Sequence, residues 1–313
     1  MNKTHFITTC SALKKTKASP FHQLGTALVD GSSTKELVSL WKDNISRASS
    51  PMLEAKDLYR GVAWKMALDA SISCNMNLMV ISAGFGLIDS SIALPSYDAT
   101  FARPSGNKGN SIPAPLNEWW DEIHKQFENN DSFKELFSKY RHDKFIICCG
   151  NDYFKAIKKD LTQAVSFLSN PPEQLVIVTS SLADCDDLLR PFCIESNSSV
   201  KHLAEIAADG KKITDRTTTV AVATYFASLY SQNNVPFSKI RKEINDKIDS
   251  IKVQKQVKRT SRDDDYIVKY IQNALITDGK LSKAKTFKQY HSDGNACLDT
   301  RFAKLYKQVI ESR

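Results

Sequence analysis

Four short runs of mostly apolar residues in the first two-thirds of the chain predict β-strands. A small or polar residue follows each run, at the point where a strand would end. Apolar runs of this length are typical of strands that are buried on both faces, as in a parallel sheet. The predicted strands are Phe6–Cys10, Leu78–Ala83, Phe145–Cys149 and Leu175–Thr179.

Amphipathic patterns between these runs predict helices, and Thr34 is expected to cap the first of them. The predicted helices are Thr34–Arg47, Glu54–Ser73, Leu116–Phe127, Ser132–Tyr140 and Asp152–Leu168. Strands that alternate with helices predict an α/β fold, in which helices flank both faces of a mostly parallel sheet.

Beyond about residue 195, helical patterns continue alone to the end of the chain. They cover Ser199–Ala208, Thr217–Tyr230, Phe237–Val257, Arg262–Ile276, Leu281–Ser292 and Asp299–Glu311. Turn signals, Asp-Gly in both cases, separate the last three segments. We therefore predict an α/β domain over residues 1–195, a helical connector over 196–258 and a basic all-helical module over 259–313. This module is either a helix-turn-helix-like DNA-binding unit or a helical cap on the α/β domain.

The segment Leu94–Pro115 is rich in proline, glycine and asparagine, which predicts a long loop. Long loops within compact domains are usually functional. Because this loop closely follows the second predicted strand, it could cover a pocket at the end of that strand.

Composition points to an ordinary soluble protein in the cytoplasm. The 313 residues are 42% hydrophobic and 25% charged, and no apolar run is long enough to cross a membrane. The N-terminal residues are too polar for a signal peptide. The seven cysteines lack zinc-finger spacing and are expected to be free thiols in a reducing compartment. We expect no metal site and no cofactor.

Charge is distributed unevenly along the chain. The net charge of +8 combines a net −2 over residues 1–210 with a net +10 over residues 211–313. A basic C-terminal third suggests a polyanion partner, and DNA is favoured because no membrane motif accompanies it. The basic residues expected to contact DNA are Lys280, Lys283, Lys285, Lys288, Arg301, Lys304 and Lys307. Phe287, Tyr290, Phe302 and Leu305 are expected to form the small core of this module.

The first strand ends in a thiol and a hydroxyl, Cys10 and Ser11, with Lys14 three residues further on. A lysine ammonium beside a thiol favours the nucleophilic thiolate. This segment is therefore a candidate catalytic site, with Cys10 as nucleophile. The structural alternative is a small buried thiol that is followed by a solvated basic loop.

Polar groups and glycines also follow the second and third strands. Close backbone approach to a ligand would suit the second strand end, although Gly-x-Gly alone is no dinucleotide fingerprint. At the third strand end, Asn151 and Asp152 either cap a helix or bind a base edge and act as general base, respectively. The candidate ligand-binding residues are Ser11, Lys14, Tyr59, Ser82, Gly84, Gly86, Tyr97, Asp98 and Asn151.

Several of these stretches resemble the YaaA family, which is named for a peroxide-stress protein. Asn-Asp-Tyr-Phe-Lys at residues 151–155 is similar to the family's Asn-Glu-Tyr-Phe-Lys, and Ser-Ala-Gly-Phe-Gly-Leu-Ile at 82–88 is similar to its Ser-Gly-Leu-Tyr-Gly-Leu-Leu. The segments at 55–61 and 9–20 also resemble family stretches, in the same order. Tyr97-Asp98 departs from the family's Tyr-Arg, and the last hundred residues have no obvious counterpart.

The resemblance implies a DNA-associated protein in stress protection, phage defence or DNA modification. Some YaaA-like proteins occur in systems that place 7-deazaguanine bases in DNA, where one is thought to act on the nitrile of the inserted base. This implies an enzyme that acts on a nucleobase, with Cys10 as nucleophile and Asp152 as base, and with partner proteins of a modification or defence operon. Two alternatives remain: a non-catalytic protein that recognises damaged or modified DNA, and a nucleotide-processing enzyme with a helical cap.

Overall fold

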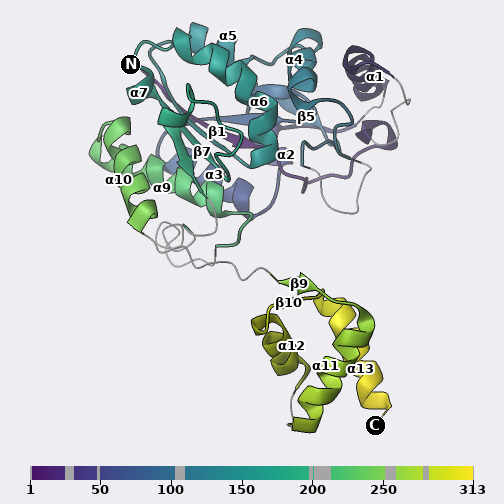
Figure 1. Cartoon of the computed structure of the whole chain (residues 1–313). Helices are drawn as coiled ribbons and strands as arrows, with labels where there is room; N and C mark the ends of the chain where they lie inside the picture. The colour runs from purple at the N-terminus through teal and green to yellow at the C-terminus, as the bar shows by residue number, and fades with distance from the viewer. Residues whose placement is uncertain are drawn as a thin grey trace. The chain divides into compact units, whose positions relative to one another are not determined.

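The computed structural model describes residues 2–24, 32–47, 50–102, 110–196, 200, 213–250, 259–277 and 282–312. The chain forms two compact units, Met1–Lys252 and Val253–Arg313 (Figure 1), which we describe separately. None of the helices in the described ranges has the length and apolar character that a membrane crossing requires.

The first unit is built on a six-stranded sheet, in the order β4-β3-β1-β6-β7-β8. Its strands are β1 (Thr4–Thr9), β3 (Asn77–Ser82), β4 (Gly86–Asp89), β6 (Lys144–Cys149), β7 (Leu175–Thr179) and β8 (Cys193–Glu195). All neighbours are parallel except β3 and β4, which form a hairpin. The four predicted strands are confirmed. Strands β4 and β8 were not predicted, because neither contains an apolar run long enough to stand out.

The order of the strands fixes where a ligand would bind. Strand β1 lies between β3 and β6, so the chain passes to one side of β1 first and to the other side later. In open α/β sheets of this kind, ligands bind outside the carboxyl ends of the strands at the point where the direction reverses. Here that point is the crevice between β1 and β6.

Helices cover both faces of this sheet, as predicted (Figure 1). Helices α4 (Leu116–Gln126), α5 (Phe133–Lys139) and α6 (Asn151–Ala164) pack together on one face, with α1 (Thr34–Arg47) beside α4. Helices α3 (Val62–Ser73), α9 (Thr218–Asn233) and α10 (Phe237–Ser250) cover the other face. The shorter elements of this unit are β2 (Met52–Glu54), α2 (Ala55–Leu58), β5 (Ala93–Pro95), α7 (Pro171–Gln174) and the 3-10 turns Pro20–His22, Val165–Phe167 and Arg190–Phe192.

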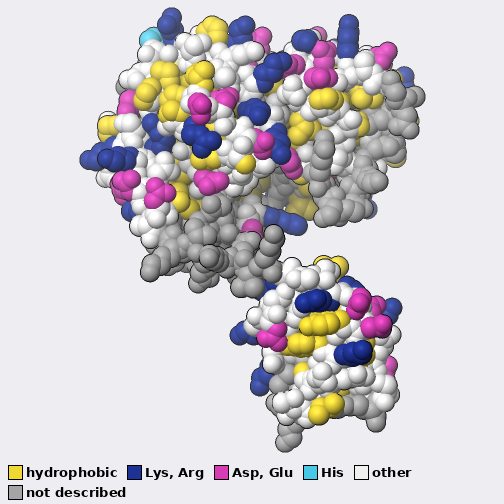
Figure 2. Space-filling model, viewed as in Figure 1, with side chains coloured by type: hydrophobic (Ala, Val, Ile, Leu, Met, Phe, Trp, Pro, Cys, Tyr) yellow, Lys and Arg dark blue, Asp and Glu magenta, His cyan; other side chains and the backbone are white. Residues whose placement is uncertain are grey.

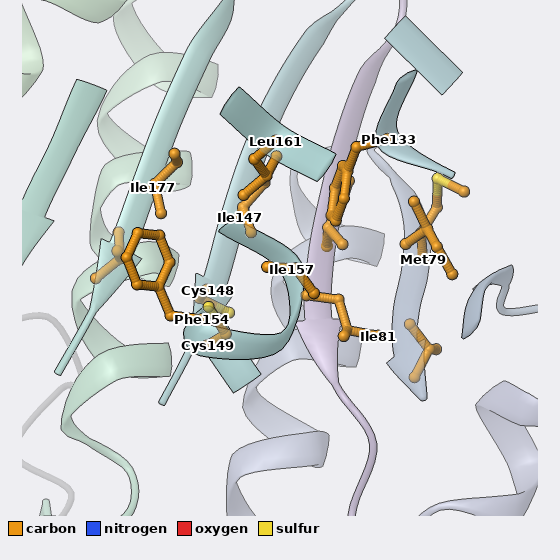
Figure 3. Close-up of a cluster of buried hydrophobic side chains, with 14 of the residues drawn as sticks. Met79, Ile81, Phe133, Ile147, Cys148, Cys149, Phe154, Ile157, Leu161 and Ile177 are labelled. Carbon is orange, nitrogen blue, oxygen red and sulfur yellow. The ribbon is translucent and has the colours of Figure 1, made fainter. Parts of the chain in front are cut away.

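Apolar side chains of α6 fill the space above the central strands (Figure 3). Phe154, Ile157 and Leu161 point toward the strand residues Ile147 and Ile177, and all five are fully buried. Burial of one such side chain contributes about 1.5–3 kcal/mol. The helix that begins at the carboxyl end of β6 is therefore held firmly against the sheet.

One predicted helix is interrupted in the structure. Instead of a single helix over Glu54–Ser73, the chain forms α2, then an extended step, then α3. Gly61 has φ +103°, a conformation that interrupts a helix and suits glycine, and Tyr59 pairs with Lys14 in an antiparallel bridge. The expected loop from Leu94 also begins with β5, which pairs with β2.

Two smaller differences concern helix starts. Ser33 rather than Thr34 caps α1, because its hydroxyl and its backbone N–H bind Glu36 in the pattern of a capping box. Helix α6 begins at Asn151 and is capped by Gly150.

The expected connector over residues 196–258 is not a separate element in its described part. Helices α9 and α10 pack on the sheet and belong to the first unit. The predicted helix Ser199–Ala208 lies outside the described residues, apart from Val200, as do Arg103 and Lys108 of the expected loop.

The described residues of the second unit form three helices, α11 (Asp264–Thr277), α12 (Lys283–Ser292) and α13 (Asp299–Glu311). A short parallel pair, β9 (Thr260–Ser261) and β10 (Asn295–Ala296), precedes α11 and α13. Tyr290, Phe302 and Leu305 are buried in its core and Phe287 packs against them, which confirms the predicted core. The other buried members are Ile267, Ile271, Leu275 and Val309.

Buried His5 makes the stability of the first unit pH-dependent. Burial lowers the pKa of His5 from its ordinary 6.5, although hydrogen bonding to Asp143, 3.0 Å away, opposes the shift. The unfolded chain therefore takes up a proton first as the pH falls through 6.5, so the free energy of unfolding should decrease. Chemical denaturation at pH 7.5 and 5.5 should show this loss, and His5→Gln should show a smaller one. An equal loss in both proteins would contradict the prediction.

Candidate functional site

Cys10 lies at the crevice where the strand order reverses. It directly follows β1, and its backbone N–H donates to the carbonyl of Ile81 on β3. Its Sγ is 3.2 Å from the hydroxyl oxygen of Tyr153, in the first turn of α6. Thr100 places its own hydroxyl 3.5 Å from that of Tyr153. A thiol from β1 and a phenol from α6 thus meet at the predicted edge of the sheet.

Lys14 adds a positive charge to this group. The side chain is partly buried, its Nζ donates to the carbonyl of Ser11 at 3.1 Å, and it lies 4.2 Å from the ring centroid of Tyr97. Burial lowers the pKa of Lys14, while negative charge at Cys10 and Asp98 raises it. The ammonium is therefore held in the site by an aromatic face and a carbonyl, and it interacts electrostatically with Cys10 and Asp98.

A buried chain of hydroxyls lies beside Lys14. The hydroxyl of Tyr97 is 2.7 Å from that of Ser82 and 2.7 Å from that of Tyr59. Burial raises the pKa of Tyr59 and Tyr97, and it does the same for Tyr153. All three phenols therefore stay protonated near neutral pH, so each can donate a hydrogen bond.

Ser82 fixes the direction of this chain. Its Oγ accepts the backbone N–H groups of Gly84 and Phe85, at 3.2 and 3.1 Å. With both lone pairs engaged, the Ser82 hydroxyl donates to Tyr97. Tyr97 can in turn donate to Tyr59, so the donor direction runs from the sheet toward Tyr59.

Two cavities meet at Cys10. One has a volume of about 190 Å³ and is lined by Cys10, Ala12, Asp98, Ala99, Thr100, Asn110, Ser111 and Tyr153. The other has a volume of about 390 Å³, and its polar lining includes Thr9, Ser11, Ser180 and Arg216. A volume of a few hundred cubic ångströms is typical of small-molecule sites. Cys10 therefore forms part of the wall of both cavities.

Asn151 and Asp152, the two residues predicted to act at the third strand end, have different surroundings. The backbone N–H of Asn151 donates to Ser180 Oγ at 3.0 Å, and its side-chain Oδ1 is buried with no partner among the described residues. Asp152 lies in the first turn of α6, but the described residues that line the two cavities do not include it. Tyr153, which was not among the predicted site residues, lies beside the thiol.

Ser82, Gly84 and Gly86 belong to the tight turn between β3 and β4. The indole N–H groups of Trp41 and Trp119 donate to the carbonyls of Gly84 and Ala83, both at 2.8 Å. The turn is buried, and Gly86 has φ +78°. Ser82 binds the Tyr97 hydroxyl and Gly84 packs closely against the Tyr97 ring, so this turn helps to position Tyr97.

Gly84→Ala should destabilise the protein and displace Tyr97. A Cβ at Gly84 would lie 2.8 Å from the Tyr97 ring and 3.3 Å from Trp41. Overpacking of this kind typically costs about 1–3 kcal/mol. Denaturant unfolding would measure the loss, with Gly150→Ala as control because a Cβ there meets no atom within 4 Å. Equal stability of the two variants would contradict the close packing of Gly84.

The basic residues predicted to contact DNA differ in their surroundings. Lys283, Arg301 and Lys307 form ion pairs with Asp299, Asp264 and Glu311. Basic and acidic side chains accordingly alternate on the face of the second unit in Figure 2. The exposed residues Lys285, Lys288 and Lys304 are the remaining candidates, while Lys280 lies outside the described residues.

Comparison with known proteins gives one match. Residues 45–180 match a family of unknown function, DUF6884. The matched segment is less than half of the chain. It includes Tyr59, Tyr97 and Tyr153 but not Cys10 or Lys14. No curated protein and no solved structure matches the chain. The resemblance to the YaaA family stays a hypothesis.

Proposed function

We propose that the protein acts on a nucleobase in DNA, with Cys10 as the nucleophile. The observation that carries this proposal is the position of the thiol, 3.2 Å from a protonated phenol, at the wall of two cavities where the sheet order reverses. A nucleophile with an adjacent proton donor is the arrangement that addition to an electrophilic carbon requires.

A nitrile on a 7-deazaguanine base suits this arrangement. The sulfur of Cys10 would add to the nitrile carbon, and the thiol proton would pass to the nitrile nitrogen by way of Tyr153 or Lys14, which gives a thioimidate. Water would then add to the same carbon, and cleavage of the carbon–sulfur bond would release the amide and restore the thiol. The net reaction is the addition of one water to the nitrile. We assign the proton transfers to Tyr153 and Lys14 rather than to Asp152, because Tyr153 is within hydrogen-bond distance of the thiol and Lys14 interacts electrostatically with it, whereas Asp152 does not line either described cavity.

The second unit would hold the DNA backbone. Residues 253–313 contain 13 Lys and Arg against 7 Asp and Glu, a net charge of +6. Such a charge attracts a polyanion, because each phosphate that is neutralised releases counterions. A cytoplasmic location, with partner proteins of a modification or defence operon, accords with this function. All seven cysteines are free, as expected in a reducing compartment.

Nucleoside analysis tests the proposal. DNA that carries a 7-deazaguanine nitrile would be incubated with the protein, digested to nucleosides and analysed by mass spectrometry beside natural DNA. We expect a mass gain of one water on the modified nucleoside alone. Unchanged nucleosides in both DNAs would contradict catalysis and would favour the alternative, a non-catalytic protein that uses the cavities to recognise a damaged or modified base.

A further inference from the structure

A surface of mixed apolar and basic character adjoins the Cys10 site. The backbone N–H of Arg60 donates to the carbonyl of Leu13 at 2.9 Å, and that of Lys15 donates to the carbonyl of Leu58 at 2.8 Å. These two hydrogen bonds join the segment after β1 to the step between α2 and α3. We call Leu13, Lys15, Arg60 and Val62 the lip of the site.

The two apolar members of the lip are unusually exposed. Leu13 is 64% exposed and Val62 is 67% exposed. The Leu13 side chain lies 3.6 Å from the position of a Cβ on Gly61, the residue before Val62. Single exposed apolar residues are ordinary, but contiguous ones at a site mark an interaction surface.

Charge indicates what this surface contacts. Lys15 and Arg60 are exposed, and each lies two residues from an apolar member of the lip in the sequence, Lys15 from Leu13 and Arg60 from Val62. The nearest exposed acid in the sequence is Asp57, while Glu54 is paired with Lys56. The lip also adjoins both cavities, because Ala12 lines the two of them and Ala63 lines the larger one. Two exposed apolar side chains with two cations close by in the sequence, next to a cavity, fit a nucleic-acid strand whose target base has left the stack.

We propose that the lip engages the DNA strand at the target base, with Leu13 and Val62 filling the space that the base vacates and with Lys15 and Arg60 on the flanking phosphates. Proteins that act on a base take it out of the stack, and apolar wedges between base steps are a recurrent device for doing so. The inference rests on the proposed function in one respect, namely that the partner is DNA.

A fluorescent base analogue tests the wedge. The full chain carrying Cys10→Ala, so that no chemistry intervenes, would bind a duplex with a single 2-aminopurine opposite an abasic site. We expect the fluorescence to rise when the Cys10→Ala chain binds, because the analogue leaves the stack. Most of this rise should be absent when the chain also carries Leu13→Ala and Val62→Ala. Affinity should fall less than about tenfold, since the phosphate contacts remain.

Matched controls separate the lip from general surface effects. Ile72 lies on the same helix as Val62, and its side chain is 70% exposed. Its replacement by alanine should leave the fluorescence rise unchanged. Arg60→Ala should make the plot of log affinity against log salt shallower by about one unit. Lys65 is a basic residue of α3, and Lys65→Ala should leave the salt dependence unchanged.

Three results would overturn the proposal. These are an unchanged fluorescence rise in the double variant, an equal loss with Ile72→Ala, and a double variant that differs from the parent in native mass. The last result would assign the lip to contact between copies of the chain. If the fluorescence rise depends on the lip but the unmodified protein converts no base, the proposal for the lip stands and only the proposed enzymatic function is refuted.

Discussion

Replacing Cys10 with serine should reduce conversion of the modified nucleoside roughly a thousandfold or more, as loss of a covalent nucleophile does in other enzymes. Serine keeps the size and the hydrogen bond to Tyr153 but is a far weaker nucleophile near neutral pH. Single-turnover assays with digested DNA would measure the loss. Tyr153→Phe should cost about a hundredfold, because it removes the adjacent proton donor and leaves the sulfur in place.

Two other cysteines bear on this experiment: Cys74 offers a control substitution, and Cys148 is excluded as an alternative nucleophile. Cys74→Ser changes a partly exposed thiol at the end of α3, and conversion should persist. Cys148 adjoins the larger cavity, but burial raises its pKa to about 12, so it cannot supply a thiolate near neutral pH. Full conversion by Cys10→Ser would refute the assigned nucleophile.

Removal of the second unit should abolish tight DNA binding and leave the first unit folded. A chain that ends at Lys252 keeps the whole core of the first unit, which shares no member with the core of the second. The intact chain should lose affinity steeply as salt increases, because its phosphate contacts release counterions. Titrations at several salt concentrations, with circular dichroism of both chains, would measure binding and folding.

The same assay can assign the contacts to residues. Lys285, Lys288 and Lys304 are exposed, and their joint replacement by alanine should make the salt dependence shallower by about three units. Lys283→Ala should change it less, because that ammonium is already paired with Asp299 at 3.1 Å. If the truncated chain binds as tightly as the intact one, the basic C-terminus takes no part in binding.

Sequence patterns predicted the parts of the fold that depend on continuous apolar runs. The four strands and the helix Asp299–Glu311 need no knowledge of distant contacts, because their own residues carry the pattern. Strand β5 was missed because three residues pair with β2 only when the chain is folded. The break at Gly61 was missed because the four-residue spacing of Leu58, Val62 and Met66 continues across it.

The candidate site was predictable to the level of strand ends but not of side chains. Placing Cys10 and Asn151 at one edge followed from parallel topology. The choice between Asp152 and Tyr153 depended on the rotation of α6 about its axis, which Phe154 and Ile157 set by packing on the sheet. Asp152 and Tyr153 are neighbours in the chain, so a single step along the helix separates the predicted base from the residue that contacts the thiol.

The two cavities that meet at Cys10 have a kinetic consequence. A base held on the Tyr153 side leaves the compartment lined by Ser180 and Arg216 open to a second reactant. If the protein catalyses the proposed reaction, it would not need to release one ligand before it admits the other, and a compound that fills the larger compartment would act as a noncompetitive inhibitor with respect to the base. One sulfur atom would be shared by two independently occupied sites.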